Sequence, residues 1–219
     1  MRIATWNVER LKHKQALTEI IETCNSVCAD IFVLTETDAQ VKPRFFDGYH
    51  TPCLAEIQPS YYKPTENRVS IYTRYPCTRQ YPTYDKYTAL CVELETERGT
   101  LLVYGTIMGI YGNRHKSFNE DLPGQIEDFR RLSAGGRNLC IAGDFNQSFS
   151  DDYYYTKAGR TMLVYSFDRF GIKVLTADQS QCIDHIALSE RFADGTPAKV
   201  DEWNLDKRLS DHKGIVVQI

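Results

Sequence analysis

Apolar and polar positions along the chain predict both helices and strands. Residues 2–7 have a strand pattern, whereas residues 13–28 place their apolar side chains on one face of a helix. Residues 31–34 are a short apolar run, which is typical of a strand buried on both faces. The beginning of the chain therefore predicts a β-α-β unit, in which a right-handed crossover joins two parallel strands.

The middle of the chain has a different pattern. Residues 41–66 are rich in proline, tyrosine and polar residues, which indicates loops with short strands. Three strand-like runs follow, and residues 97–99 predict a hairpin turn between the second run and the third. This stretch predicts antiparallel sheet, formed by the runs Val69–Thr73, Thr88–Glu95 and Thr100–Met108.

The last part again alternates helices and strands. Apolar spacing predicts a helix over residues 120–132, ended by Gly135 and Gly136, and a second helix over 160–170, ended by Gly171. Short apolar runs predict strands at 139–142, 172–176, 183–188 and 214–219. Helices are therefore expected outside and β-structure inside.

Composition excludes several classes of protein. Hydrophobic residues make up 42% and charged residues 25% of the chain, which excludes a disordered protein. No apolar run approaches the ~20 residues that span a bilayer. A formal net charge of -3 argues against coating nucleic acid by bulk charge, but it leaves room for a local basic groove. Without a linker or repeat, residues 1–219 are expected to form one domain.

The first residues and the cysteines bear on the compartment. The chain enters strand-like sequence at once, without the basic segment and apolar core of a leader, which favours a cytoplasmic protein. Seven cysteines are scattered, mostly in apolar runs, which indicates buried reduced thiols. Cys24 and Cys28 are one helical turn apart and could bind metal, but no second Cys or His pair follows at zinc spacing.

Polar residues stand at the ends of five predicted strands. Each alone has an ordinary explanation as an exposed residue, a turn or a cap. Ligands of α/β folds bind where strand ends meet, and carboxylates that share one cleft repel each other unless a cation lies among them. Carboxylate and amide oxygens suit Mg²⁺ or Mn²⁺, which suggests phosphoryl chemistry. The segments are Asn7–Glu9, Thr35–Glu36, Gly143–Asn146, Ile183–His185 and Ser210–His212.

Spacing within two of these segments predicts which side chains face the cleft. Asp144 and Asn146 are two residues apart, so in an extended segment they point to the same side. Asp184 and His185 are adjacent, so only one of them faces the site. We expect Asp184 to face the site and His185 to pack on the outer face.

These motifs, in this order, resemble the endonuclease/exonuclease/phosphatase superfamily, which includes deoxyribonucleases, apurinic endonucleases, inositol polyphosphate phosphatases and neutral sphingomyelinases. The resemblance spans residues 5–212 and depends most on Gly143-Asp144-Phe145-Asn146 and Ser210-Asp211-His212. It implies an α/β fold, a four-layer α/β/β/α sandwich with two packed mixed sheets. It also implies a phosphodiester hydrolase, preferably a nuclease, that depends on Mg²⁺ or Mn²⁺.

The resemblance assigns roles to individual residues. Asp144 would deprotonate the attacking water, Asn146 would hold the phosphate and the nucleophile, and His212 would contact the scissile phosphate. Asp184 would orient this histidine and raise its pKa. Glu36 would be the principal metal ligand. The other implied metal ligands are Asn7, Glu9 and Asp211.

One departure from the superfamily concerns the leaving group. Several branches have a second histidine, or a tyrosine, near the end of the strand that here reads Val103–Met108. This chain offers Thr106, which can donate a hydrogen bond to phosphate but cannot act as a general acid at neutral pH. The proton for the leaving oxygen would then come from water on the metal, from Tyr104 or from Tyr111. Tyr104 and Thr106 are accordingly expected near the substrate.

Substrate contacts are expected from basic and aromatic loop residues, although charged loop residues are often only solvated. The candidates for phosphate contact are Arg68, Arg114 and Lys116. Tyrosines at 61–62 and 153–155 could stack bases of a single strand or pack over a sheet edge. We expect a nucleic acid substrate, no membrane, no protein partner and a monomer.

Two other functions stay open at this point. One is a phosphatase or phosphodiesterase for a small or lipid phosphate. The other is a binding module that has the fold without the chemistry. Asn67–Ser70 stands where small residues are usual, and the chain lacks an extended segment of apurinic endonucleases, which disfavours dedicated abasic-site repair.

Overall fold

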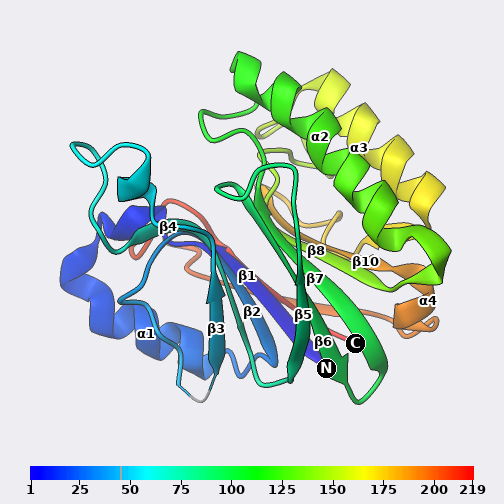
Figure 1. Ribbon diagram of the computed structural model, residues 1–219, viewed down its shortest axis with the longest axis horizontal. Helices are drawn as coiled ribbons and strands as arrows, with labels where there is room; N and C mark the ends of the chain where they lie inside the picture. Colours follow the sequence, from blue (N-terminus) through cyan, green and yellow to red (C-terminus); the bar gives the residue numbers. More distant parts are fainter. Residues whose placement is uncertain (45) are drawn as a thin grey trace.

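The computed structural model describes residues 1–44 and 46–219, so one position of the predicted loop region 41–66, Phe45, lies outside the described residues. It contains two six-stranded sheets (Figure 1). The first contains β1 (Arg2–Asn7), β2 (Ile31–Asp38), β3 (Asp47–His50), β4 (Glu66–Thr73), β11 (Lys199–Trp203) and β12 (Gly214–Gln218). The second contains β5 (Cys77–Tyr81), β6 (Ala89–Thr96), β7 (Gly99–Ile107), β8 (Leu139–Asp144), β9 (Ile172–Val174) and β10 (Asp184–Ser189).

Both sheets are mixed. The strand orders are β11-β12-β1-β2-β4-β3 and β5-β6-β7-β8-β10-β9. The pairs β1–β2 and β7–β8 are parallel, and the other pairs are antiparallel. The helices are α1 (Leu17–Ser26), α2 (Lys116–Ser133), α3 (Lys157–Phe170) and α4 (Glu190–Ala193). None of the helices in the described ranges is long and apolar enough to cross a bilayer.

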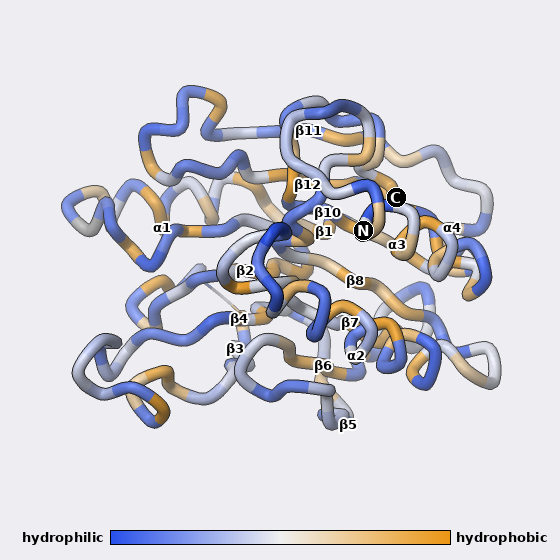
Figure 2. The backbone as a smooth tube through the Cα atoms, turned by 90° about the horizontal axis from the view of Figure 1, so that it is seen from above, coloured by the Kyte–Doolittle hydropathy of each residue, from blue (hydrophilic) through white to orange (hydrophobic). Residues whose placement is uncertain are grey.

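Three hydrophobic cores separate four layers. Helix α1 covers the outer face of the first sheet with Ile20 and Cys24, which pack in one core with Trp6 and Phe32. The inner faces of the two sheets share a second core, rich in valine and isoleucine. Helices α2 and α3 cover the second sheet with a third core that includes Phe129. In the view from above, hydrophobic residues gather in the central strands (Figure 2). The predicted α/β/β/α sandwich is therefore confirmed.

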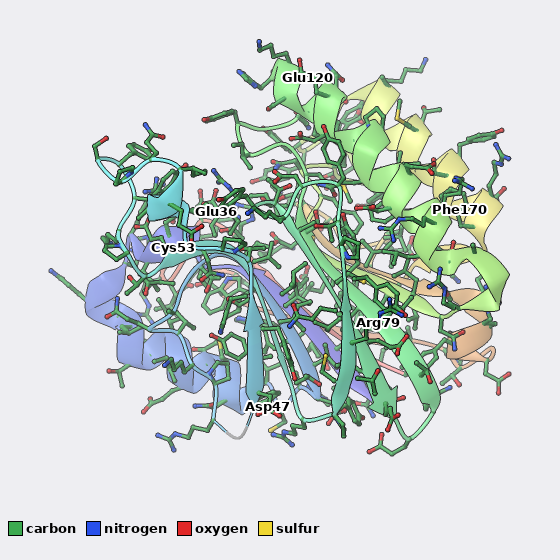
Figure 3. The ribbon with its side chains drawn as sticks, viewed as in Figure 1. Glu36, Asp47, Cys53, Arg79, Glu120 and Phe170 are labelled. Atoms are coloured by element: carbon green, nitrogen blue, oxygen red, sulfur yellow. The ribbon has the colours of Figure 1, made fainter. Side chains whose placement is uncertain are left out.

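Strand direction brings the candidate residues to one end of this sandwich. The parallel strands β1 and β2 end at the same edge, and β8 ends at Asp144. The antiparallel strand β10 begins there, because Asp184 pairs with Asp144. In Figure 3, Glu36 lies at the upper end of the sheets and Asp47 at the lower end. The termini lie at the lower end in Figure 1.

The predicted elements are found, with shifted ends. Helix α2 begins at Lys116 instead of 120, because His115 accepts a hydrogen bond from the Ser117 amide and caps it. Helix α3 ends where predicted, at Gly171 with φ 64. Two strands escaped prediction, namely β5 and β11, whereas β3 lies within residues 41–66, where short strands were expected without bounds. β3, β5 and β11 are all exposed or half-buried edge strands, so their sequences lack the apolar signal of a buried strand.

Gly143 fixes the backbone just before Asp144. Its φ is 138, and a Cβ atom there would overlap the Thr106 carbonyl oxygen of the neighbouring strand β7. Gly171 also has positive φ, at 64, but has open space around it. Gly143→Ala should therefore lower the free energy of unfolding by about 3 kcal/mol, and Gly171→Ala by about 1 kcal/mol. Urea unfolding of both variants measures this difference, and equal losses would contradict it.

Candidate active site

Asp144 lies at the centre of the convergent strand ends. Its Oδ1 accepts a hydrogen bond from the Asn146 amide at 2.8 Å, and its Oδ2 accepts one from Asn7 Nδ2 at 3.2 Å. Burial raises the pKa of Asp144 to about 7, and the charge of Asp184 raises it too, whereas His212 opposes the rise. A carboxyl group with such a pKa can both hold and release a proton near neutrality.

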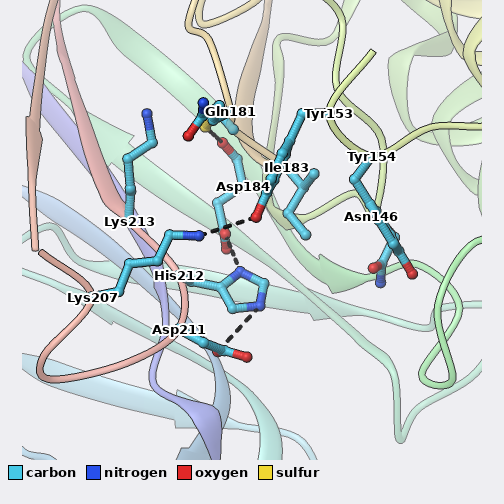
Figure 4. A pocket seen from close by; sticks show the side chains of 11 residues that line it. Asn146, Tyr153, Tyr154, Gln181, Ile183, Asp184, Lys207, Asp211, His212 and Lys213 are labelled. Atoms are coloured by element: carbon cyan, nitrogen blue, oxygen red, sulfur yellow. Dashed lines mark hydrogen bonds and ion pairs between the residues drawn. The ribbon is translucent and has the colours of Figure 1, made fainter. Parts of the chain in front are cut away.

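Asp184 and His212 form a buried ion pair beside this carboxyl. Asp184 Oδ2 lies 2.5 Å from His212 Nδ1 (Figure 4). Burial alone would lower the pKa of His212, but the charge and hydrogen bond of Asp184 raise it to about 10. The ring is therefore an imidazolium at neutral pH, and its Nε2 is 3.7 Å from Asp211 Oδ1.

The loop that carries His212 is tied to its surroundings through backbone atoms. Asn204 Nδ2 donates to the carbonyl oxygens of Ser210 and His212, at 2.8 and 2.7 Å. Trp6 Nε1 also donates to the His212 carbonyl at 3.1 Å, and Ser210 Oγ donates to the Asn7 carbonyl at 2.6 Å. These contacts fix the imidazole relative to β1.

Glu36 comes to the site from β2 in an uncommon backbone conformation, with φ 42. The pairs Thr35–Val69 and Thr37–Asn67 put Arg68 opposite Glu36. Burial raises the pKa of Glu36, while the charges of His212 and Arg68 lower it. Among the described residues no hydrogen bond or ion pair to the Glu36 carboxylate is present. It is thus a half-buried carboxylate with room for a ligand.

Glu9, an expected metal ligand, has polar partners within the protein. Its carboxylate lies 2.7 Å from Lys12 Nζ and accepts a hydrogen bond from the Asp211 amide at 3.1 Å. Burial would raise the pKa of Glu9, but these bonds lower it. Glu9 therefore holds the loop of Asp211 against the turn after β1. The Asp211 side chain is 62% exposed.

The structure does not bring Tyr104 and Thr106 to the cleft, which corrects their expected place beside the substrate. Both side chains are buried on the helix-covered face of the second sheet. Tyr104 donates to Asp128 at 2.9 Å, and Thr106 donates to Gln125 at 2.7 Å, both on α2. Burial also raises the pKa of Tyr104 well above its ordinary value. Neither hydroxyl is available to a leaving group.

Two cavities flank the group. One, of about 250 Å³, is lined by Asn146, Asp184 and His212 together with Tyr153 and Lys207 (Figure 4). Lys207 Nζ donates a hydrogen bond of 3.0 Å to the Tyr153 hydroxyl. The other, of about 430 Å³, is lined by Glu36, Gln58 and Ile110, and by the basic and aromatic residues Arg10, Lys12, Tyr61, Tyr62, Arg68 and Tyr111. Arg114 and Lys116 are exposed, in the segment after Tyr111.

The donor set limits the metal that these residues can hold. Within residues 1–44 and 46–219, no group of three or more His, Cys, Asp or Glu side chains could hold a metal ion. Mg²⁺ takes one or two protein carboxylates and completes its shell with waters and substrate phosphates. Asn7 on β1 pairs with Thr35 on β2, the residue before Glu36. The Glu36 carboxylate and the Asn7 amide oxygen meet this smaller requirement. The residues fit one largely hydrated divalent cation.

Two positioning residues carry no motif in the sequence. Asn204 holds the His212 loop, as described above. Asn113 donates Nδ2 to the Asn146 carbonyl at 2.7 Å. Asn204 bonds to backbone atoms six and eight residues further along the chain, and Asn113 to one 33 residues away, and no residue pattern signals either contact. The Gly-Asn pair at 112–113 is a turn signal, but a turn signal says nothing of the partner.

The fold and the buried acid–base group define a class of protein, the two-sheet phosphoesterases. The chain belongs to the endonuclease/exonuclease/phosphatase family, whose sequence model matches residues 4–212. This confirms the resemblance drawn from the motifs. The members and structural relatives of this family are hydrolytic phosphoesterases and nucleases. None of the curated proteins has a significant match to the chain.

Solved structures share the fold at low sequence identity. The endonuclease domain of TRAS1, a telomere-specific non-LTR retrotransposon, is 18% identical with a TM-score of 0.70, and the match covers 100% of this chain and 97% of that one. The 3′-5′ exonuclease NExo from Neisseria meningitidis is 17% identical, with a TM-score of 0.70 and coverage of 100% and 99%. An AP endonuclease from Archaeoglobus fulgidus is 12% identical, with the same TM-score and coverage as NExo.

His185 packs on the outer face of its strand, as predicted. Its Nε2 is 2.9 Å from the Gln147 carbonyl and its Nδ1 is 2.9 Å from Thr176 Oγ1. Full burial lowers the pKa of His185 from 6.5 to about 4, so the folded protein holds a neutral ring. Asp184, its neighbour in the chain, faces the opposite side and pairs with His212.

This neutral ring predicts a pH dependence of stability. The unfolded chain binds a proton at His185 below pH 6.5, whereas the folded protein does so only below about 4. Stability from this residue is therefore complete above pH 6.5 and falls as the pH drops, by about 3 kcal/mol in all. Urea unfolding across this range should show a flatter pH dependence for His185→Gln than for the wild type, and parallel curves would contradict the assignment.

Proposed function

We propose that the protein is a divalent-metal-dependent phosphodiester hydrolase that acts on nucleic acid. The observation that carries the proposal is the cross-strand pairing of Asp144, with a pKa near 7, with Asp184, which holds an imidazole of pKa near 10 at His212. Groups with pKa values pushed apart in one buried site are what acid–base chemistry needs. Family membership supports a phosphoesterase.

Asp144 is the general base in this proposal. Its carboxyl accepts the proton of a water molecule that attacks the phosphorus. Asn146 Nδ2 donates to the carbonyl oxygens of Met108 and Gly109, at 2.9 and 3.2 Å. Only the Asn146 Oδ1 atom is then left for the cleft. Asn146 therefore holds the nucleophilic water through Oδ1, and not the phosphate, because a carbonyl oxygen cannot donate to a phosphate oxygen.

His212 stabilises the phosphate. Asp184 holds Nδ1, so the Nε2–H is the donor left for the cleft. Negative charge grows on the phosphate oxygens during attack, and a fixed imidazolium donor stabilises that charge more than it stabilises the substrate. Asp184 Oδ1, which has no hydrogen-bond partner in the part of the chain that the structure describes, adds negative charge beside the ring, which further holds its proton.

Glu36 and Asn7 would hold the metal, and the family is generally dependent on a divalent one. When bound, the ion supplies positive charge to the phosphate oxygens. Because Tyr104 faces α2, the side chain left to protonate the leaving oxygen is Tyr111, which is exposed beside the Glu36 cavity. Residues 1–219 are proposed to act as one domain.

The role of Asp144 can be tested by substitution. Asp144→Asn keeps the shape of the side chain and removes the base, so turnover should fall by about 10²- to 10⁴-fold. Hydrolysis of plasmid, single-stranded DNA, single-stranded RNA and a chromogenic diester, with Mg²⁺, with Mn²⁺ or with chelator, measures the effect and ranks the substrates. Activity on the small diester alone would favour a small-phosphate enzyme, and full activity of the variant would refute the assignment.

The Asp184–His212 pair predicts strong coupling. In wild type the His212 ring should keep its proton up to pH about 10. In Asp184→Asn the pKa of His212 should fall, because burial is then opposed only by the charges of Asp144 and Asp211. NMR of the imidazole measures this. The variants Asp184→Asn, His212→Gln and the double variant should each lose about 10²- to 10³-fold in kcat. Losses that multiply in the double variant would show that the two residues act separately.

A further inference from the structure

The cavity on the Glu36 side contains an arginine whose charge has no ion-pair partner among the described residues. Arg68 is 6% exposed and lines this cavity. Its Nη2 donates to the Tyr62 hydroxyl at 3.0 Å, and its guanidinium lies over the Tyr62 ring at 5.6 Å. Within the described part of the chain Arg68 forms no salt bridge, not even with Glu36 across the β2–β4 pair. A buried, unpaired guanidinium favours an anion.

The second basic residue of the cavity is already neutralised. Arg10 Nη2 lies 3.0 Å from Glu66 Oε2, and Arg10 Nη1 donates to the Tyr61 hydroxyl at 3.1 Å. Its guanidinium is 4.7 Å from the ring centres of both Tyr61 and Tyr62. Arg10 follows Glu9 in a turn with positive φ, which fixes it at the cavity. Its role is to orient the tyrosines, whereas Arg68 keeps its charge for a ligand.

An aromatic surface opens beside this charge. Tyr61 is 59% exposed and Tyr111, from the loop after β7, is 67% exposed. Both line the same cavity as Arg68 and Glu36. A volume of about 430 Å³ lies in the range of small-ligand sites. An anion site next to an exposed, oriented ring matches a phosphate and a nucleobase.

We infer that this cavity binds the nucleotide next to the scissile phosphate, with its own phosphate on Arg68 and its base stacked on Tyr61. A base within a duplex is stacked on its neighbours, so the site takes a single-stranded or unpaired nucleotide. The inference rests on the proposed function, because it assigns the Glu36 side of that site to one nucleotide of the substrate. It makes single-stranded nucleic acid the substrate class.

Binding without turnover tests the inference. A fluorescent single-stranded oligonucleotide is titrated with the protein in chelator over a series of salt concentrations. Tyr61→Leu should weaken binding by about tenfold and leave the salt dependence unchanged, because stacking involves no charge. Arg68→Gln should lower the slope of log K against log salt by about 0.7, the value for one phosphate contact to a single strand. Arg68→Lys should restore most of that slope.

A matched control is present on α3. Tyr165 is 61% exposed, and the Arg169 guanidinium lies 5.6 Å from its ring centre. It is therefore the same kind of tyrosine–arginine pair, remote from both cavities. Tyr165→Leu should bind the oligonucleotide like the wild type. The thermal unfolding of each variant shows whether it folds, and if Arg68→Gln does not, the comparison of Tyr61→Leu with Tyr165→Leu decides.

The outcomes separate this inference from the proposed function. Equal binding by the wild type and by Tyr61→Leu would overturn the nucleotide site, even if the enzyme cleaves DNA. If Tyr61→Leu lost as much affinity for a blunt duplex as for the single strand, the single-strand assignment would be overturned. A wild type that binds the oligonucleotide through Tyr61 and Arg68, but does not cleave it with any metal, would support the site and contradict the proposed hydrolysis.

Discussion

Asp184 and His212 meet because the start of β10 in one sheet and the loop before β12 in the other are packed together. The pair therefore exists only when the two sheets are assembled in the right register. Each partner would be costly to bury alone, since an unpaired charge inside a protein is strongly destabilising. The fold and the site thus depend on the same contact between sheets. The hydrogen bonds of Asn204 and Trp6 to the His212 carbonyl keep this contact in one geometry.

The charges at this end of the sandwich are not balanced by the protein itself. Asp144, Asp184 and Glu36 share low-dielectric surroundings, and His212 and Arg68 are the cations that act on the Glu36 carboxyl most strongly. Burial raises the pKa of both Asp144 and Glu36, which means that the ionised form of each carboxyl is destabilised. A divalent cation and a phosphate, entering together, would add opposite charges at the two flanks. The charges of the site therefore favour binding of a cation together with an anion over binding of a neutral ligand.

Much of the fold could be predicted, because buried strands and amphipathic helices have strong periodic signals. The exposed strands β5 and β11 could not, and β3 was expected only as an unplaced short strand, since hydrogen bonding and not apolar burial defines these strands. At the site, the order of motifs identified Asp144, Asp184 and His212 as neighbours. It failed for Tyr104 and Thr106, because β7 is apolar on both faces and its pattern does not show which face a helix covers. It did not show that Glu9 bonds to Lys12 and to the Asp211 backbone, because the orientation of Glu9 depends on a turn with positive φ that no residue type signals.

The adjacent residues Asp184 and His185 lie in very different environments on the two faces of β10. One points into the cleft and the other into an aromatic layer formed by Phe145 and Phe149, so the thickness of a single strand separates a charged environment from an apolar one. A shift of β10 by one residue against β8 would exchange them, which would put a carboxylate among phenylalanines. A single insertion inside this strand would therefore remove the chemistry and the packing at once.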